Sequence, residues 1–143
     1  SAVPGGWVDE RLMANIMDTL LQVGFAGDSA AYQDFARGLA AAGISRFLKI
    51  FLSLTSARFA LCRVPVVWNH LRRNAGEVTV ARDCNGLRLW YVGFPFCARE
   101  AYRLLSVANC EALAQAAGGN APCARVESWS ADTLQLHFDL KAV

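Results

Sequence analysis

The sequence predicts an α+β fold in which N-terminal helices pack on a four-stranded antiparallel sheet formed by a ββαββ unit. In the first half of the chain, apolar residues recur every three to four positions, which is typical of amphipathic helices. From Glu77 to Leu140 they alternate with polar residues in four short segments, and a helix-length segment separates the two pairs. We therefore expect residues 1–143 to form a single domain with a helical half (7–74) and a ββαββ half (77–140).

Two amphipathic helices should open the helical half. The first spans Trp7–Phe25 and ends at the glycines that follow it. The second spans Ala30–Ala42 and is capped by Asp28 or Ser29. The residues expected to face the core are Val8, Leu12, Ile16, Leu20 and Val23 in the first helix and Tyr32, Phe35 and Leu39 in the second.

A third helix, from Ser45 to about Cys62, is apolar nearly all round, which predicts a central position in the fold. Pro65 has no amide hydrogen and disfavours helical geometry at the residue before it, so the chain should kink or break there. A short fourth helix, Val66–Arg73, should carry Trp68 on one side and end the helical half.

The second half should contain two hairpins separated by a helix. The first hairpin pairs Glu77–Arg82 with Leu87–Val92 across Asn85-Gly86, because both residues of an Asn-Gly turn tolerate positive φ. The remaining elements are a helix over Cys97–Ala117 and the strands Cys123–Trp129 and Thr133–Leu140.

The composition is unusually apolar for a soluble domain. Apolar residues make up 55% of the chain and charged residues 18%, and the mean hydropathy is +0.26. This surplus must face a partner, a ligand cavity or a large core. A membrane span is not expected, because Lys49, Arg58 and Arg63 interrupt the most apolar region. The net charge of +2 is too small to indicate nucleic-acid binding.

The cysteines favour reduced thiols. There are five, with no Cys-x-x-Cys pair, and we see no secretory signal before them, so we expect a cytoplasmic protein. Four of them stand 13 residues apart and suggest a zinc site (Cys84, Cys97, Cys110 and Cys123). If Cys97 and Cys110 share one helix, however, they lie ~20 Å apart, which argues against a four-thiolate site. A mixed site of some of these cysteines with His137 is the remaining alternative, and we expect neither a metal nor another cofactor.

Several segments of the chain together resemble a known domain family. They are Trp68-Asn69-His70-Leu71-Arg72-Arg73, Gly76-Glu77-Val78, Tyr102, Gly118-Gly119, Ala124-Arg125-Val126-Glu127 and Leu134-Gln135-Leu136-His137-Phe138. This pattern of helix ends and strands, which covers roughly Ile44–Leu140, resembles a paralogous family of uncharacterised domains abundant in myxobacteria. That family is distantly similar to the vinyl-reductase-type small-molecule-binding domain, and beyond it to the vesicle-tethering-complex and haem nitric-oxide-binding folds.

The resemblance implies a sensor or adaptor module that is often dimeric, with an apolar cavity between the sheet and its helices. The final hairpin departs from the vinyl-reductase-type pattern, since Glu127 and Ser128 and then His137 stand where cysteines would be expected. A metal or ligand role for those cysteines therefore does not transfer to this chain.

An apolar ligand pocket is the first site prediction. Its walls would be Phe47, Phe51, Leu54, Cys62 and Trp68 from the helices and Leu89, Tyr91, Phe94 and Tyr102 from the sheet half. Cys62 could face the cavity or carry a thioester-linked acyl chain, although a packed core cysteine is the simpler interpretation. The turn Phe94-Pro95-Phe96 is the predicted cavity mouth or subunit contact.

A basic patch is the second site prediction. Its members are Arg72, Arg73, Arg88 and Trp90, and they would bind an anion or a partner protein. A solvated basic rim is the simpler alternative. The two histidines, His70 and His137, belong to no recognisable catalytic motif.

The sequence thus predicts a non-enzymatic cytoplasmic sensor or adaptor, acting as a homodimer and binding an apolar small molecule, a lipid or a partner protein. A scaffold domain without a small ligand, whose apolar surface forms an oligomeric interface, is the alternative. A cysteine-dependent enzyme or redox sensor is a third hypothesis. A cavity of a few hundred Å³ would favour the ligand, and a filled core the scaffold.

Overall fold

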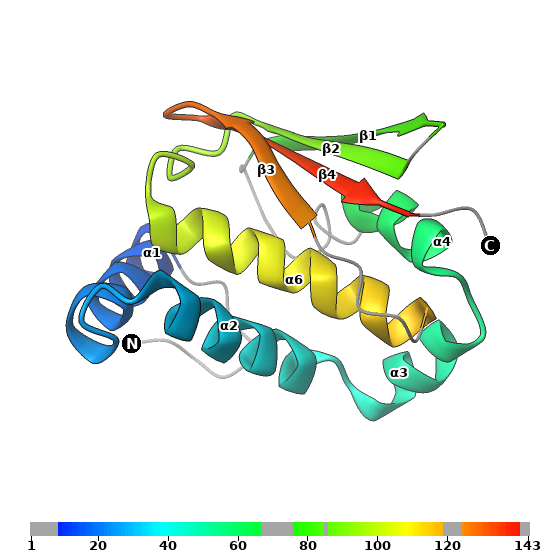
Figure 1. The fold of residues 1–143 in the computed structure, drawn as a ribbon, viewed down its shortest axis with the longest axis horizontal. Helices are drawn as coiled ribbons and strands as arrows, with labels where there is room; N and C mark the ends of the chain where they lie inside the picture. Colours follow the sequence, from blue (N-terminus) through cyan, green and yellow to red (C-terminus); the bar gives the residue numbers. More distant parts are fainter. Residues whose placement is uncertain (1–8, 67–75, 85, 119–123, 141–143) are drawn as a thin grey trace.

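The computed structural model describes residues 9–66, 76–84, 86–118 and 124–140, and it confirms the α+β class. Its helices are α1 (Glu10–Thr19), the π-helical turn η1 (Leu20–Gly24), α2 (Ser29–Gly43), α3 (Arg46–Ser53), α4 (Ala57–Cys62) and α6 (Glu100–Gly118). Its strands are β1 (Glu77–Asp83), β2 (Gly86–Val92), β3 (Ala124–Trp129) and β4 (Thr133–Asp139). Figure 1 shows the sheet on one side of α6, and α1 and α2 on the other.

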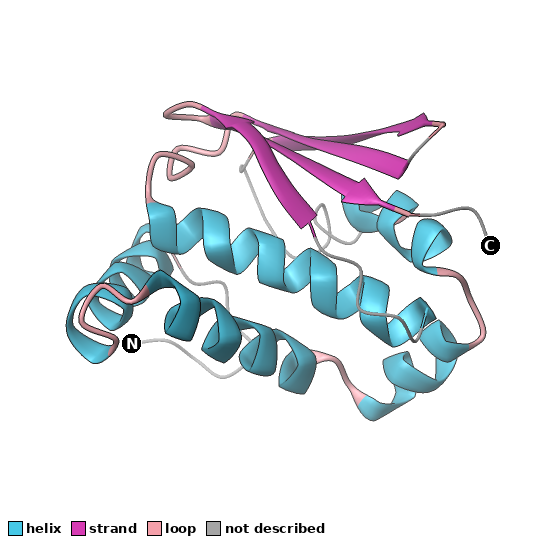
Figure 2. Ribbon diagram, viewed as in Figure 1, coloured by secondary structure: helices cyan, strands magenta, loops and turns pink. Residues whose placement is uncertain are grey.

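The four strands form one antiparallel sheet in the order β1-β2-β4-β3. The first hairpin therefore meets the second through the central strands β2 and β4, and β1 and β3 are the edges. The described helices all lie on one face of this sheet (Figure 2). Along β1, β2 and β4, side chains alternate between this helix-facing side and the outer side, as the sequence predicts, whereas a bulge between Val126 and Ser128 interrupts the alternation in β3.

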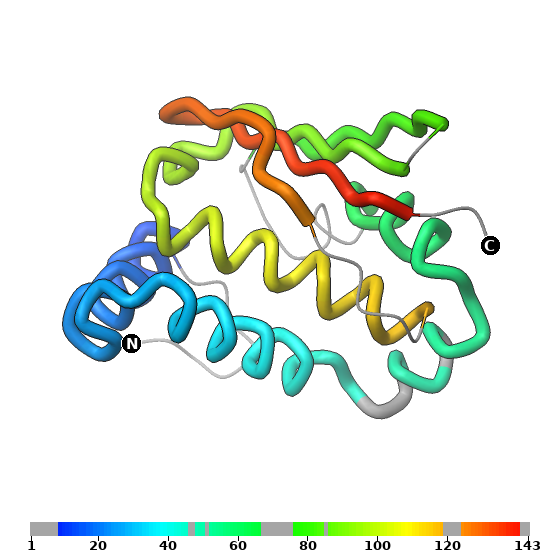
Figure 3. Tube along the Cα trace, in the orientation of Figure 1, coloured from blue at the N-terminus to red at the C-terminus, as the bar shows by residue number. Residues whose placement is uncertain are grey.

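The long helix α6 occupies the centre of the molecule. It crosses the helix-facing side of the sheet, and α1, α2, α3 and α4 all pack against it, as the tube in Figure 3 also shows. The N-terminal helices α1 and α2 are therefore separated from the sheet by α6. Small side chains make this close approach feasible, since α6 buries Ala101, Ala108, Ala112, Ala114 and Ala117.

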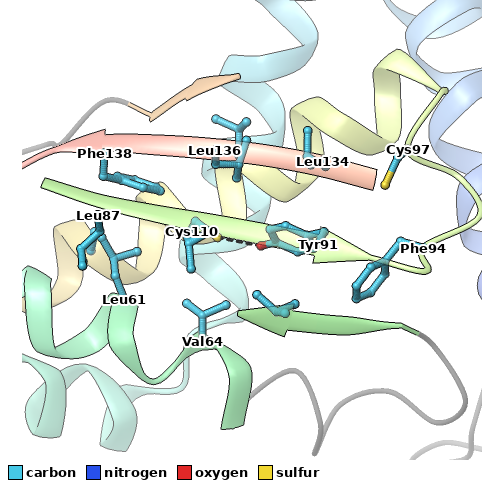
Figure 4. Packing of buried hydrophobic residues seen from close by; sticks show 14 of the residues in the cluster. Leu61, Val64, Leu87, Tyr91, Phe94, Cys97, Cys110, Leu134, Leu136 and Phe138 are labelled. Atoms are coloured by element: carbon cyan, nitrogen blue, oxygen red, sulfur yellow. Dashed lines mark hydrogen bonds between the residues drawn. The ribbon is translucent and has the colours of Figure 1, made fainter. Parts of the chain in front are cut away.

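Two hydrophobic clusters lie on opposite sides of α6. The larger one joins the sheet, α4 and α6, and includes Leu61, Leu87, Leu136 and Phe138 (Figure 4). The smaller one joins α1, η1, α2 and α6 around the fully buried Tyr32. The Tyr32 hydroxyl donates a hydrogen bond of 2.9 Å to the carbonyl of Ala101, and burial, with a smaller effect of Asp18, raises the pKa of Tyr32 to about 12.

A buried carboxylate connects three elements. Glu111 of α6 accepts a hydrogen bond of 2.8 Å from Arg37 Nε on α2 and one of 3.0 Å from the amide of Ala124 on β3. Two charge-assisted contacts satisfy a carboxylate that would otherwise be costly to bury. They fix α2 and the start of β3 relative to α6.

The predicted third helix is wrong in its extent, because the chain divides it into α3 and α4. Thr55 ends α3 by donating hydrogen bonds from its amide and its hydroxyl to the carbonyl of Leu52. Ser56 then caps α4, since its Oγ accepts a hydrogen bond of 3.1 Å from the amide of Phe59. Local capping by these two hydroxyl residues interrupts an apolar pattern that continues past the break.

The inward faces predicted for the first two helices are also partly wrong. Leu12, Ile16 and Val23 are exposed, and Ala14, Met17 and Leu21 are buried instead. In α2, Tyr32 is buried as predicted, but Phe35 and Leu39 are exposed. Polar contacts select the face of α1 that meets α6, because Arg99 Nη1 binds Asn15 Oδ1 at 2.7 Å and Asp18 Oδ2 at 3.0 Å.

Gly86 is required for a reason other than the one predicted. It pairs with Asp83 as the first residue of β2, so it belongs to the strand and not to the predicted turn. A side chain here would collide with the backbone carbonyl of Phe138 on the neighbouring strand β4. Close approach of two strands, and not a positive φ, therefore demands glycine at this position.

We predict that Gly86→Ala destabilises the protein by about 3 kcal/mol or more, because backbone atoms of β4 must move to admit the methyl group. The matched control is Gly38→Ala in α2, where a Cβ would meet no neighbouring atom. The control should stabilise the protein by up to about 1 kcal/mol, since glycine weakens a helix interior. Urea unfolding curves of both variants measure the change, and equal midpoints would contradict the close packing of β2 on β4.

Candidate functional site

The sheet half of the predicted ligand pocket belongs to the packed core. Leu89, Tyr91, Phe94 and Tyr102 are all buried in the larger cluster, and Cys62 packs against it. The rings of Tyr91 and Phe94 meet edge to face with 5.3 Å between their centroids (Figure 4). The structure thus places these five residues in or against one hydrophobic cluster. A ligand cavity among them stays a prediction.

The other helical residues of the predicted pocket are not placed in this cluster. Leu54 is 82% exposed in the turn between α3 and α4, because the break in the predicted helix turns it outward. Phe47 and Phe51 lie on α3, but their side chains are outside the described part of the structure. Trp68 lies outside the described residues altogether. Leu54 was therefore wrongly predicted as part of a shared wall.

The two rings of the turn Phe94-Pro95-Phe96, which was predicted as a cavity mouth or subunit contact, pack against other residues of the chain. Phe94 is buried, and Phe96 is half-buried between the ring of Tyr102, 6.0 Å away, and the guanidinium of Arg99, 5.1 Å from its centroid. Both rings of this turn therefore have partners within the same chain, and neither forms the exposed aromatic contact that the sequence predicted.

The buried thiol of Cys110 lies in the same core. Its Sγ is 3.1 Å from the hydroxyl of Tyr91, a hydrogen bond in which either atom can donate (Figure 4). Burial raises the pKa of Cys110 to about 11, although the contact with Tyr91 acts in the opposite direction. At neutral pH the thiol is protonated and is a poor nucleophile.

The outer face of the sheet carries the described part of the predicted basic patch. Arg88 and Trp90 share this face, and Trp90 is half-buried, whereas Arg72 and Arg73 lie outside the described residues. Arg88 is paired on both sides: its Nε lies 3.1 Å from Glu127 Oε2 and its Nη1 lies 2.9 Å from Asp83 Oδ2. The hydrogen bond from Arg88 lowers the pKa of Glu127 below its usual range.

His137 lies at the centre of the same face and is only 3% exposed, because charged side chains from the neighbouring strands cover it. Its Nε2 is 3.4 Å from Asp83 Oδ2, and its Nδ1 is 3.3 Å from Asp139 Oδ1 and 3.1 Å from Arg125 Nη2. The sequence placed His137 on the polar face, which is correct. His137 contacts Asp83 of β1 and Arg125 of β3, which strand alternation alone does not bring together. The outer face is thus a network of paired charges.

Exposed apolar side chains gather on the helical half instead. Large apolar residues of α1, η1 and α2 reach the surface, and further ones follow on α3, α4 and the residues after it. They are Leu12, Met13, Ile16, Val23, Phe35, Leu39, Leu48, Ile50, Leu54, Phe59 and Val66. The sequence prediction missed this surface because it assigned the residues of α1 and α2 to the core. We call the part formed by Leu12, Met13, Ile16, Phe35 and Leu39 the helical apolar surface.

A groove of about 470 Å³ lies between the first half of α6 and β3. Its lining residues are Glu100, Arg103, Leu104, Val126, Glu127, Ser128 and Trp129. Arg103 stacks on Trp129 with 3.9 Å between its guanidinium carbon and the ring centroid, and its Nη1 donates to the carbonyls of Cys97 and Ala98. The groove is thus part apolar and part polar, and it was not predicted from the sequence.

Among the described residues, no three or more His, Cys, Asp or Glu side chains are arranged to hold a metal ion. The described helices include none of the length and apolar character needed to cross a membrane. No protein-family model matches the sequence, and no curated protein matches it either.

We predict that Glu127→Gln lowers stability most at neutral pH. The folded-state pKa of Glu127 lies below its usual value of 4.5, so the stabilisation is complete above that value and is lost as the pH falls through the folded-state pKa. Urea unfolding of both proteins between about pH 7 and pH 3 measures this, and the two curves of stability against pH should converge in acid. Curves that stay parallel over the whole range would contradict the pairing with Arg88.

We predict that alkylation distinguishes the described cysteines. The exposed Cys84 should react with iodoacetamide in the folded protein, whereas Cys97 and Cys110 should react only after unfolding in urea, because both are buried. Peptide mass spectrometry after timed labelling measures the order. Fast modification of Cys110 in the folded protein would instead favour the hypothesis of a cysteine-dependent enzyme or redox sensor.

Proposed function

We propose that this chain is a non-enzymatic adaptor or scaffold module of the cytoplasm, and that it binds a second copy of itself through the helical apolar surface. The observation that carries this proposal is the exposure of five large apolar side chains on α1 and α2, in a chain whose cluster between sheet and helices is packed. The compartment is proposed from the cysteine pattern of the sequence.

The positions of these side chains suit a helix–helix contact. Leu12, Met13 and Ile16 share one face of α1, and Phe35 and Leu39, four residues apart, share one face of α2. Full burial of one such side chain contributes about 1.5–3 kcal/mol, so half-exposed ones still gain substantially when a partner covers them. Exposed apolar patches of this kind mark interaction surfaces in monomeric soluble proteins.

The outer face of the sheet is less suited to apolar association. Its charged groups already pair with one another, as in Arg88 with Asp83 and Glu127, and an apolar partner would desolvate them. The helical apolar surface carries no such cost, which supports it as the self-association surface.

Binding of an apolar small molecule or lipid is the second candidate function. Its support is the family resemblance and the convergence of Leu89, Tyr91, Phe94, Tyr102 and Cys62 on one cluster. A ligand there would have to separate side chains that contact one another, such as the rings of Tyr91 and Phe94. Because separating packed side chains costs free energy, we rank the adaptor function above ligand binding.

We predict that Ile16→Lys weakens self-association about tenfold or more, because it places a charge within an apolar interface. Ile16 is 49% exposed in the single chain, so its replacement should leave the fold intact. The matched control is Val92→Lys, at a 51% exposed valine on the outer side of the sheet, which should associate like the wild type. Sedimentation equilibrium measures association, and circular dichroism checks folding.

Two results would contradict the proposal: a wild-type chain that stays monomeric at the highest soluble concentration, or a folded Ile16→Lys variant that associates as tightly as the wild type.

A further inference from the structure

A second surface for self-association follows from β3, an edge strand of the described sheet, and it goes beyond the proposed function because it lies on different residues. β3 pairs with β4 on one side and is the last strand of the described sheet on the other. All its residues after Ala124 are exposed. An edge strand of this kind can accept another strand through its main-chain groups.

The direction of the free groups can be worked out from Ala124. Its amide donates to Glu111 Oε1 and so points away from β4. Because main-chain groups alternate along an antiparallel strand, the N–H and C=O of Val126, two residues later, point the same way. Val126 pairs with Leu136 before the register shift that separates Val126 from Ser128, so the bulge does not alter this alternation.

The side chains of β3 are complementary to those of the same strand running in the opposite direction. Arg125 and Glu127 flank Val126, and both contact residues of the outer face, His137 and Arg88 respectively. A two-fold axis at Val126 would place Arg125 of one copy opposite Glu127 of the other, on the same side of the sheet, and would do so twice.

The groove provides the apolar part of the contact. Val126 is 39% exposed and Trp129 51% exposed on the helix-facing side of β3, beside Leu104 of α6. Val126 of a second copy would lie next to Val126 on this side and cover the apolar wall of the groove. Glu111, bound to the Ala124 amide, limits the pairing at one end, and the bulge limits it at the other.

We propose that β3 pairs antiparallel with β3 of a second copy around a two-fold axis at Val126, which joins the two sheets edge to edge. Together with the helical apolar surface, this gives each protomer two self-complementary contacts, and two such contacts on one chain generate assemblies larger than a dimer.

Disulfide crosslinking of Val126→Cys tests the pairing. The two Cα atoms of a directly opposed, hydrogen-bonded pair lie ~5.5 Å apart, which a disulfide spans. In a Cys84→Ser background, which removes the thiol that is exposed among the described cysteines, copper phenanthroline should convert most of the chain into a covalent dimer. The control Val92→Cys, at a more exposed valine, should remain uncrosslinked. Equal yields at the two positions, or no crosslink at Val126→Cys, would overturn the proposal.

Charge reversal at Arg125 provides a second test of the β3 pairing. Adding Arg125→Glu to the crosslinking variant places two carboxylates opposite each other, so the crosslinking rate should fall about tenfold. The side chain of Arg125 is largely exposed, so the fold should tolerate the change. An unchanged rate would overturn the proposed register. Adding Ile16→Lys instead should leave the rate unchanged, because that change acts on the separate helical surface. The failure of either self-association proposal can thus be distinguished from that of the other.

Discussion

The packing of every layer against α6 is the constraint on which the rest of this structure depends. One side of the helix meets the sheet and the other meets α1 and α2, and most of the side chains that α6 buries are small. Alanines at Ala101, Ala108, Ala114 and Ala117 permit this approach from both sides. Glu111 also fixes how α2 and β3 lie relative to α6, because it binds α2 through Arg37 and β3 through the amide of Ala124. Hydrogen bonds to a charged group contribute about 1.5–3 kcal/mol each where they are well formed.

The available surfaces follow from this arrangement. Because α6 covers the helix-facing side of the sheet and the inner sides of α1 and α2, the apolar residues that remain point away from the centre. The edge strand β3 packs against α6 but leaves Val126 and Trp129 exposed beside the groove. The opposite face of the sheet is closed to apolar partners by the paired charges around His137. The two proposed self-association contacts, through the helices and through β3, would both use surfaces that α6 leaves exposed.

Much of the fold was predictable from the sequence, and the reasons are local. Strict alternation from Leu134 to Phe138 indicated a strand with one buried face, and β4 has that face in the core. The strands around Gly86 were placed within a residue, although the glycine serves a close approach to Phe138 and not the predicted turn geometry. These features depend on periodicity and on short-range turn chemistry, which a single sequence contains.

The candidate surfaces were not predictable in the same way. α1 carries apolar residues on two faces, and the choice between them depends on Arg99, which is distant in sequence and binds Asn15 and Asp18. The break between α3 and α4 depends on the hydroxyl of Ser56 competing with an apolar pattern that favours one helix. The burial of His137 depends on Asp83 and Arg125, which tertiary pairing brings together. Each of these outcomes is set by contacts between elements, which local periodicity does not contain.

Native mass spectrometry of the protein purified under mild conditions tests the central claim most directly. It reports in one spectrum how many copies associate and whether any small molecule stays bound. The proposed self-association through the helical apolar surface predicts dimers or larger assemblies, whose masses are whole multiples of the mass of the chain. A monomer that carries an additional apolar mass, released on denaturation, would contradict the adaptor and establish a ligand-binding sensor in its place.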